Sequence, residues 1–79
     1  MGSEVLVDGR WLEPPEPMER VLRALDSLAP DQTLRFLIHR EPLPLYALLQ
    51  ERGLSYRARP IADDCFEILI TQSPSHPPS

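Results

Sequence analysis

Cys65 is the side chain in this sequence best suited to covalent chemistry, and it is the chain's only cysteine. A thiol reacts as thiolate, which positive charge or a helix N-terminus stabilises. Here Asp63 and Asp64 come directly before Cys65, and acidic neighbours disfavour the thiolate. Arginines in the preceding segment could offset this effect only if the two segments pair as strands. We therefore interpret Cys65 as an incidental thiol.

His39 and Glu41 form a second group, at the end of a β-prone segment and before a proline. Open α/β sheets bind ligands at such strand ends, so these residues are candidates for a small-ligand or metal-associated site. A metal centre needs three or four ligands, and His39, Cys65, His76 and the carboxylates show no ligand spacing. We interpret His39 as a solvated strand-end histidine and expect no metal and no cofactor.

The segment Glu13–Pro17 (EPPEP) is the third candidate, and it precedes a helical pattern. Prolines at a helix entry cost little, because the N–H groups that they lack would be unpaired there anyway. One interpretation is a rigid recognition surface formed by Trp11, Glu13 and Glu16. The other is a stiff helix start that only sets the angle of the helix, and the residues leave both open.

Six elements must position these side chains. Alternating or β-prone patterns predict four strands, and apolar residues at helical spacing predict an amphipathic helix from about Pro15 to Leu28 and a shorter one ending at Gly53. The order β-α-β-α-β-β implies right-handed parallel crossovers and a closing hairpin. We expect an α/β two-layer sandwich, with a four-stranded mixed sheet and both helices on one face. The predicted strands are Glu4–Asp8, Thr33–His39, Leu54–Arg59 and Cys65–Thr71, with a turn over 60–64.

Strand periodicity assigns side chains to two faces of this sheet. The face covered by helices should carry Val5, Val7, Leu34, Phe36, Ile38, Leu54, Tyr56, Phe66, Ile68 and Ile70. Three leucines on the open face could mark a protein-binding or homodimer surface. Arginines there give a weak case for RNA, because no aromatic side chains accompany them for base stacking. The open face should carry Leu6, Arg35, Leu37, Arg57, Arg59, Cys65, Glu67 and Leu69.

Composition narrows the classes of function. The net charge of -4 makes nucleic-acid binding unfavourable, because an acidic domain repels phosphate. No run of about 18 apolar residues could span a membrane, and no basic region followed by an apolar stretch suggests a signal peptide. The single cysteine fits a reducing compartment, so we expect a cytoplasmic protein. Residues 1–71 should form one domain, and the polar stretch 72–79 a disordered tail.

The stretch from Asp8 to Pro17 resembles the D-x-x-G-L-x-C-P-x-P pattern of the TusA/SirA-like sulfur-carrier superfamily. Trp11 stands in place of the family's glycine, and Pro14 in place of its cysteine. The resemblance extends to Glu41-Pro42 and covers about residues 5–70. The chain is still more similar to an uncharacterised branch with E-P-P-E-P and E-P-x-P-L-Y, whose members are also found fused to other domains.

In that superfamily the cysteine at the helix start bears the transferable sulfur, and proline has no nucleophile. The resemblance therefore implies the fold and a partner-docking surface without the sulfur chemistry. We expect a non-catalytic protein-binding or accessory module that is not an enzyme. The alternatives are a divergent sulfur carrier or sulfurtransferase that uses Cys65, and a small-ligand or metal-associated domain that uses His39. The candidate binding residues are Trp11, Glu13, Glu16, Arg35, Leu37, His39, Glu41, Arg57 and Leu69.

Overall fold

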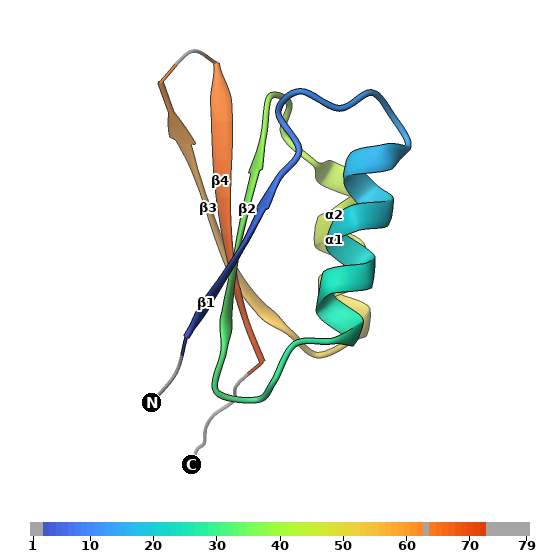
Figure 1. The fold of residues 1–79 in the computed structure, drawn as a ribbon, viewed down its shortest axis with the longest axis vertical. Helices are drawn as coiled ribbons and strands as arrows, with labels where there is room; N and C mark the ends of the chain where they lie inside the picture. The colour runs from blue at the N-terminus through green and yellow to red at the C-terminus, as the bar shows by residue number, and fades with distance from the viewer. Residues whose placement is uncertain (1–2, 63, 73–79) are drawn as a thin grey trace.

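A computed structural model describes residues 3–62 and 64–72 of the chain. In chain order the elements are β1 (Glu4–Asp8), α1 (Glu16–Asp26), β2 (Thr33–Ile38), α2 (Leu43–Glu51), β3 (Ser55–Ile61) and β4 (Cys65–Thr71). The sheet has the order β1-β2-β4-β3, in which β1 and β2 are parallel and the other neighbours antiparallel. Both helices cover one face of the sheet, so the predicted α/β two-layer fold is confirmed (Figure 1).

The core lies between the sheet and the two helices. It forms because α1 places Val21 and Leu25 on one face, four residues apart, and α2 does the same with Leu45 and Leu49. Every residue predicted for the covered face either belongs to this cluster or packs against it. The prediction of that face is confirmed. The sheet contributes Leu34, Phe36, Ile68 and Ile70 as its buried members.

Helix α2 ends in the hydrogen-bond pattern of a Schellman motif. The Leu54 N–H donates to the Leu49 carbonyl at 2.9 Å, and the Gly53 N–H donates to the Gln50 carbonyl at 3.1 Å. Gly53 has a φ of 71°, in the left-handed region that side chains disfavour. This confirms the glycine stop predicted from the sequence, and it fixes the direction in which the chain enters β3.

Replacing Gly53 with alanine should lower the free energy of unfolding by about 1 kcal/mol, because a Cβ disfavours this backbone conformation. No atom lies within 4 Å of the added Cβ, so the cost should be conformational and not steric. Urea denaturation measures the effect. Gly53→Asn is the control, since asparagine tolerates the left-handed region and should lose less. Equal losses in the two variants would contradict this account.

The predicted turn over 60–64 is too long, because β3 continues through Pro60 to Ile61. Pro60 pairs with Phe66 although it has no N–H to donate. It can do so because β3 is an edge strand, where proline is tolerated. Ile61 pairs with Cys65 at the turn, and Asp64 has a φ of 58°. Short hairpin loops commonly contain one residue in this left-handed conformation.

No helix within residues 3–62 and 64–72 is long and apolar enough to cross a membrane.

After β4, the chain is attached to the end of α1, because the Gln72 side-chain amide donates a hydrogen bond of 2.6 Å to the Leu28 carbonyl. The rest of the predicted tail, residues 73–79, lies outside the described residues.

Candidate binding surface

The loop between β1 and α1 is held by Asp8 and Arg10. The Arg10 backbone N–H, Nε and Nη2 donate to the Asp8 carboxylate at 3.1, 2.9 and 2.8 Å. These bonds lower the pKa of Asp8, mainly through the side-chain contact with Arg10, and the same contact raises the pKa of Arg10. The Gly9 N–H donates to the Leu37 carbonyl at 2.7 Å, which attaches the loop to β2. The loop therefore has a defined shape as it leaves the sheet.

Trp11 projects from this loop with 83% of its surface exposed. The guanidinium carbon of Arg10 lies 5.9 Å from the centre of the Trp11 ring, within the range of a cation–π contact. After the tryptophan, the Leu12 N–H donates a hydrogen bond of 3.3 Å to the Gly9 carbonyl. A large apolar ring thus faces solvent beside a charged arginine, in a segment closed by hydrogen bonds.

The EPPEP segment serves a structural purpose and also presents an exposed surface. Pro17 is buried, and Glu16 opens α1 with an ion pair of 3.1 Å to Arg20. The Pro14–Pro15 peptide bond is cis. Glu13 and Glu16 are exposed, as proposed for a recognition surface. A hollow of about 470 Å³ lies here, lined by Glu13, Pro14, Pro15, Glu16, Glu19, Arg20 and Arg23.

The open face of the sheet carries a ladder of alternating charges across all four strands. Glu67 on β4 is 5% exposed and lies between Arg59 of β3 and Arg35 of β2. Arg59 Nε donates to Glu67 Oε1 at 2.7 Å, and Arg35 Nε lies 3.2 Å from Glu67 Oε2. The latter N–H is not aimed at an acceptor, so this second contact is an ion pair and not a hydrogen bond. Arg35 Nη2 also lies 3.5 Å from Glu4 on β1.

The three leucines predicted for the open face do not form a continuous strip. Leu6 is 58% exposed, whereas Leu37 and Leu69 are partly buried. The strand register places Arg35 directly between Leu6 and Leu69, so a charge interrupts the apolar surface. Arg57 is exposed opposite Leu69. Arg57 and Leu69 line a hollow of about 370 Å³ together with four hydroxyl-bearing side chains, those of Thr33, Ser55, Tyr56 and Thr71.

Cys65 is only 8% exposed, at the start of β4. Its interaction with the Arg10 guanidinium is among the causes that raise the pKa of Arg10, after the contact with Asp8. From the sequence we expect any positive charge near Cys65 to come from the arginines of β3. In the structure it comes from Arg10, in the loop after β1. Nothing in the sequence indicated this contact, because the two residues lie near opposite ends of the chain.

His39 and Glu41 lie beyond the end of β2, and both are exposed. The Tyr46 hydroxyl of α2 donates to the Glu41 carboxylate at 3.2 Å. The Tyr46 ring also stacks on Tyr56 of β3, with the ring centres 4.8 Å apart. Within residues 3–62 and 64–72, no three histidine, cysteine, aspartate or glutamate side chains are grouped so that they could hold a metal ion.

The Tyr46 contacts predict a pH dependence of stability. Burial, followed by the charge and the hydrogen bond of Glu41, raises the pKa of Tyr46 to about 12. In the unfolded chain tyrosine ionises near a pH of about 10. Tyr46 therefore keeps its hydroxyl proton in the folded state at a pH where it loses that proton in the unfolded state. The contribution of Tyr46 to stability is complete below about pH 10 and is lost as the pH rises towards about 12.

Urea denaturation from pH 9 to 12 measures this effect, with Tyr46→Phe as the matched variant. Phenylalanine keeps the stacked ring and has no proton to lose, so its unfolding free energy should fall less steeply with pH. If the two proteins lose stability in parallel over this range, Tyr46 is not the group responsible.

Comparisons with known proteins give one match. A family model described as "Uncharacterized conserved protein (DUF2249)" matches residues 6–72. Those residues include both helices, almost all of the sheet and every candidate site residue named above. No curated protein and no solved structure matches the chain.

Proposed function

The chain belongs to the DUF2249 family of uncharacterised conserved proteins, and we propose that this member is a non-catalytic protein-binding module. Its contact surface is the loop between β1 and α1, with Trp11 as the anchor. Glu13 lies on the same loop and Glu16 opens α1, and both supply charges at the rim. The protein then acts by presenting this surface to a partner, as an accessory domain would.

The observation that supports this proposal best is the exposure of Trp11, 83%, on a loop fixed at both ends. Tryptophan and arginine are enriched among the residues that contribute most to binding at protein interfaces. A loop whose backbone is already held by hydrogen bonds needs little further ordering when a partner covers its side chains. Arg10, whose guanidinium carbon lies 5.9 Å from the centre of the ring, adds a charged group beside it.

We further propose that the domain shares the architecture of the TusA/SirA-like sulfur carriers without their chemistry. The order β-α-β-α-β-β and the strand–loop–helix unit around Pro14 support this view. At the helix entry, where the carriers have a cysteine, Pro14 supplies no group that could hold sulfur.

Affinity capture from cell extract, quantified for three proteins in parallel, tests the proposed function. Wild type should retain a reproducible partner, and Trp11→Ala should weaken its binding by at least about tenfold, the size expected at an interface anchor. Leu43→Ala is the matched control, because Leu43 is also an exposed apolar side chain, at 62%, but belongs to α2. Equal retention by wild type and Trp11→Ala would overturn the assignment of Trp11.

A second candidate is a divergent sulfur carrier that uses Cys65, and the contact between Arg10 and the thiol favours it. Arg10 would supply the positive charge beside the sulfur atom that acts as the nucleophile. In this reaction Cys65 would attack the outer sulfur of a donor persulfide, gain that sulfur and release the donor thiol. The thiol is 8% exposed, so a donor could reach it only after a local opening of the loop.

Incubation with a cysteine desulfurase and cysteine, followed by intact-mass measurement, separates the two candidates. A gain of one sulfur atom that a reductant reverses and that Cys65→Ser abolishes would establish the carrier function. If the mass stays unchanged while a thiol reagent shows that Cys65 is reduced, the carrier function is rejected.

A further inference from the structure

We propose that the outer edge of β1 binds an extended peptide with acidic side chains, which joins the sheet as an additional strand. This inference rests on the proposal that the chain is a binding module. It assigns a second surface, distinct from Trp11, and the chemical class of the segment that binds there. Four features of the structure support it: the direction of the β1 backbone groups, the groove beside them, the charge of that groove and the contrast with the other sheet edge.

The hydrogen bonds between β1 and β2 show which backbone groups of β1 point outward. The Thr33 N–H donates to the Ser3 carbonyl, and the Gly9 N–H donates to the Leu37 carbonyl. In a parallel pair, alternate residues direct both backbone groups to the neighbouring strand. The odd-numbered residues of β1 therefore face β2. The N–H and C=O groups of Leu6 and Asp8 point to the outer edge, where they can pair with another strand.

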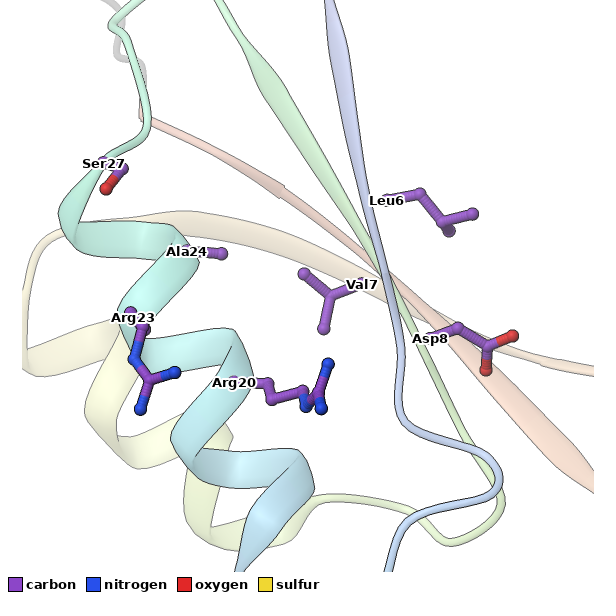
Figure 2. A pocket seen from close by; sticks show the side chains of 7 residues that line it. All are labelled: Leu6, Val7, Asp8, Arg20, Arg23, Ala24 and Ser27. Carbon is purple, nitrogen blue, oxygen red and sulfur yellow. The ribbon is translucent and has the colours of Figure 1, made fainter.

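A groove of about 340 Å³ runs between this edge and α1. Figure 2 shows Val7 pointing into it toward Ala24, while Leu6 and Asp8 point to the opposite side of the strand. An added strand would direct alternate side chains into this groove and the others over the open face. The groove is lined by Leu6, Val7, Asp8, Arg20, Ala24, Arg23 and Ser27.

The charge of the groove selects the kind of segment that fits. Arg20 reaches from α1 toward β1 (Figure 2), and its guanidinium is paired with Glu16 at 3.1 Å. Arg23 also lines the groove and makes no ion pair with any residue of the described part. A carboxylate on the added segment would complement Arg23, because arginine presents several donors to a carboxylate.

The two edges of the sheet differ in how they are protected. The β3 edge contains Pro60 and two arginines, Arg57 and Arg59, and such residues are common devices against strand addition. The β1 edge has the sequence EVLVD, without proline, lysine or arginine. Pairing with a second copy over the whole strand, antiparallel about Leu6, would place Glu4 opposite Asp8 twice, and like charges in that position destabilise a sheet. A separate segment whose acidic side chains point into the groove, on the side of the strand opposite to Asp8, therefore fits this edge better than a second copy.

The probe for the test is a fluorescently labelled peptide of alternating valine and glutamate, compared with a peptide in which lysine replaces glutamate. Fluorescence measures the affinity of each peptide. NMR follows the amide hydrogen exchange of the full chain as the peptide is added, and so identifies where the peptide binds. The glutamate peptide should slow exchange at Leu6 and Asp8, whose N–H groups point outward. Val5 and Val7 serve as internal references, because their N–H groups already face β2. The lysine peptide should bind at least about tenfold more weakly.

Two variants probe the backbone and the charge separately. Leu6→Pro removes one outward N–H and leaves the bonds between β1 and β2 in place, so it should abolish peptide binding. Arg23→Glu should weaken the glutamate peptide by about tenfold, through one lost pair and one new repulsion. Arg40→Glu is the control with the same change of charge, because Arg40 is exposed in the connection after β2.

The proposal is overturned if the glutamate peptide leaves exchange at Leu6 and Asp8 unchanged, or if Arg23→Glu binds it as wild type does. It is also overturned, in favour of self-association, if both amides are protected without peptide and the protein sediments as a dimer. These results do not depend on Trp11. If Trp11→Ala loses its captured partner but binds the peptide normally, the two surfaces are separate, and if only the peptide fails, the proposed function still stands.

Discussion

Gly9→Ala should lower the free energy of unfolding by about 1–3 kcal/mol, because the added Cβ has no room. It would lie 3.0 Å from Pro17 Cβ, 3.2 Å from the Phe36 ring and 3.3 Å from the Leu37 carbonyl. None of these can move easily, since the proline ring is stiff and Phe36 is 1% exposed. A chain of 79 residues has a total stability of roughly 4–12 kcal/mol, so the loss is a large fraction.

Urea denaturation of Gly9→Ala beside Gly53→Ala measures this effect and separates two roles of glycine. Gly9 is needed for close approach, whereas Gly53 is needed for its backbone conformation. Because the added Cβ would push the start of α1 away from the sheet, Gly9→Ala should also weaken partner binding through Trp11. A Gly9→Ala protein as stable as wild type would mean that α1 does not pack as described.

Glu67→Gln should lower the free energy of unfolding by about 1–2 kcal/mol. A charged hydrogen bond contributes about 1.5–3 kcal/mol. The expected loss is smaller here because the Arg35 and Arg59 side chains are 41% and 67% exposed. Glutamine keeps the shape of the side chain but removes the charge that both arginines share. The open face would then carry two arginines without their common partner.

Glu16→Gln is the matched control for this charge effect. Glu16 is paired with Arg20 on the exposed surface of α1, and such pairs contribute only about 0.3–0.5 kcal/mol. In high salt the effect of Glu16→Gln should nearly vanish while most of the effect of Glu67→Gln remains, because salt screens exposed pairs more than buried ones. Urea denaturation at low and high salt measures both. Equal losses in the two variants would show that the burial of Glu67 adds nothing.

The sequence predicted the fold well, because local patterns determine it. The bounds of β1 and β4 agree with the prediction, and α1 begins within the proline-rich segment where the sequence placed its start. Alternation assigned the covered face correctly, since a strand with one buried face must direct every second side chain into the core. The error at Pro60 came from treating proline as a turn signal, whereas an edge strand tolerates it.

The candidate surface could be predicted only in part. The place of Trp11 before the helix followed from the order of elements, but its exposure of 83% did not, because the residues left a recognition surface and a purely structural helix start equally open. The contact between Arg10 and Cys65 and the burial of Glu67 did not, because both depend on strand register and on long side chains crossing between strands. The groove between β1 and α1 was also missed, since its lining joins residues from two elements whose spacing the sequence does not encode.

Fluorine NMR of fluorotryptophan-labelled protein tests the central claim most directly. Trp11 is the only tryptophan, so the spectrum contains one resonance from the chain, and an unlabelled partner adds none. The account predicts that this resonance shifts or broadens when the captured partner is added, as the ring passes from solvent into an interface. A partner that binds, as shown by sedimentation, while the Trp11 resonance stays at its solvent-exposed position would contradict the claim that Trp11 anchors the binding surface.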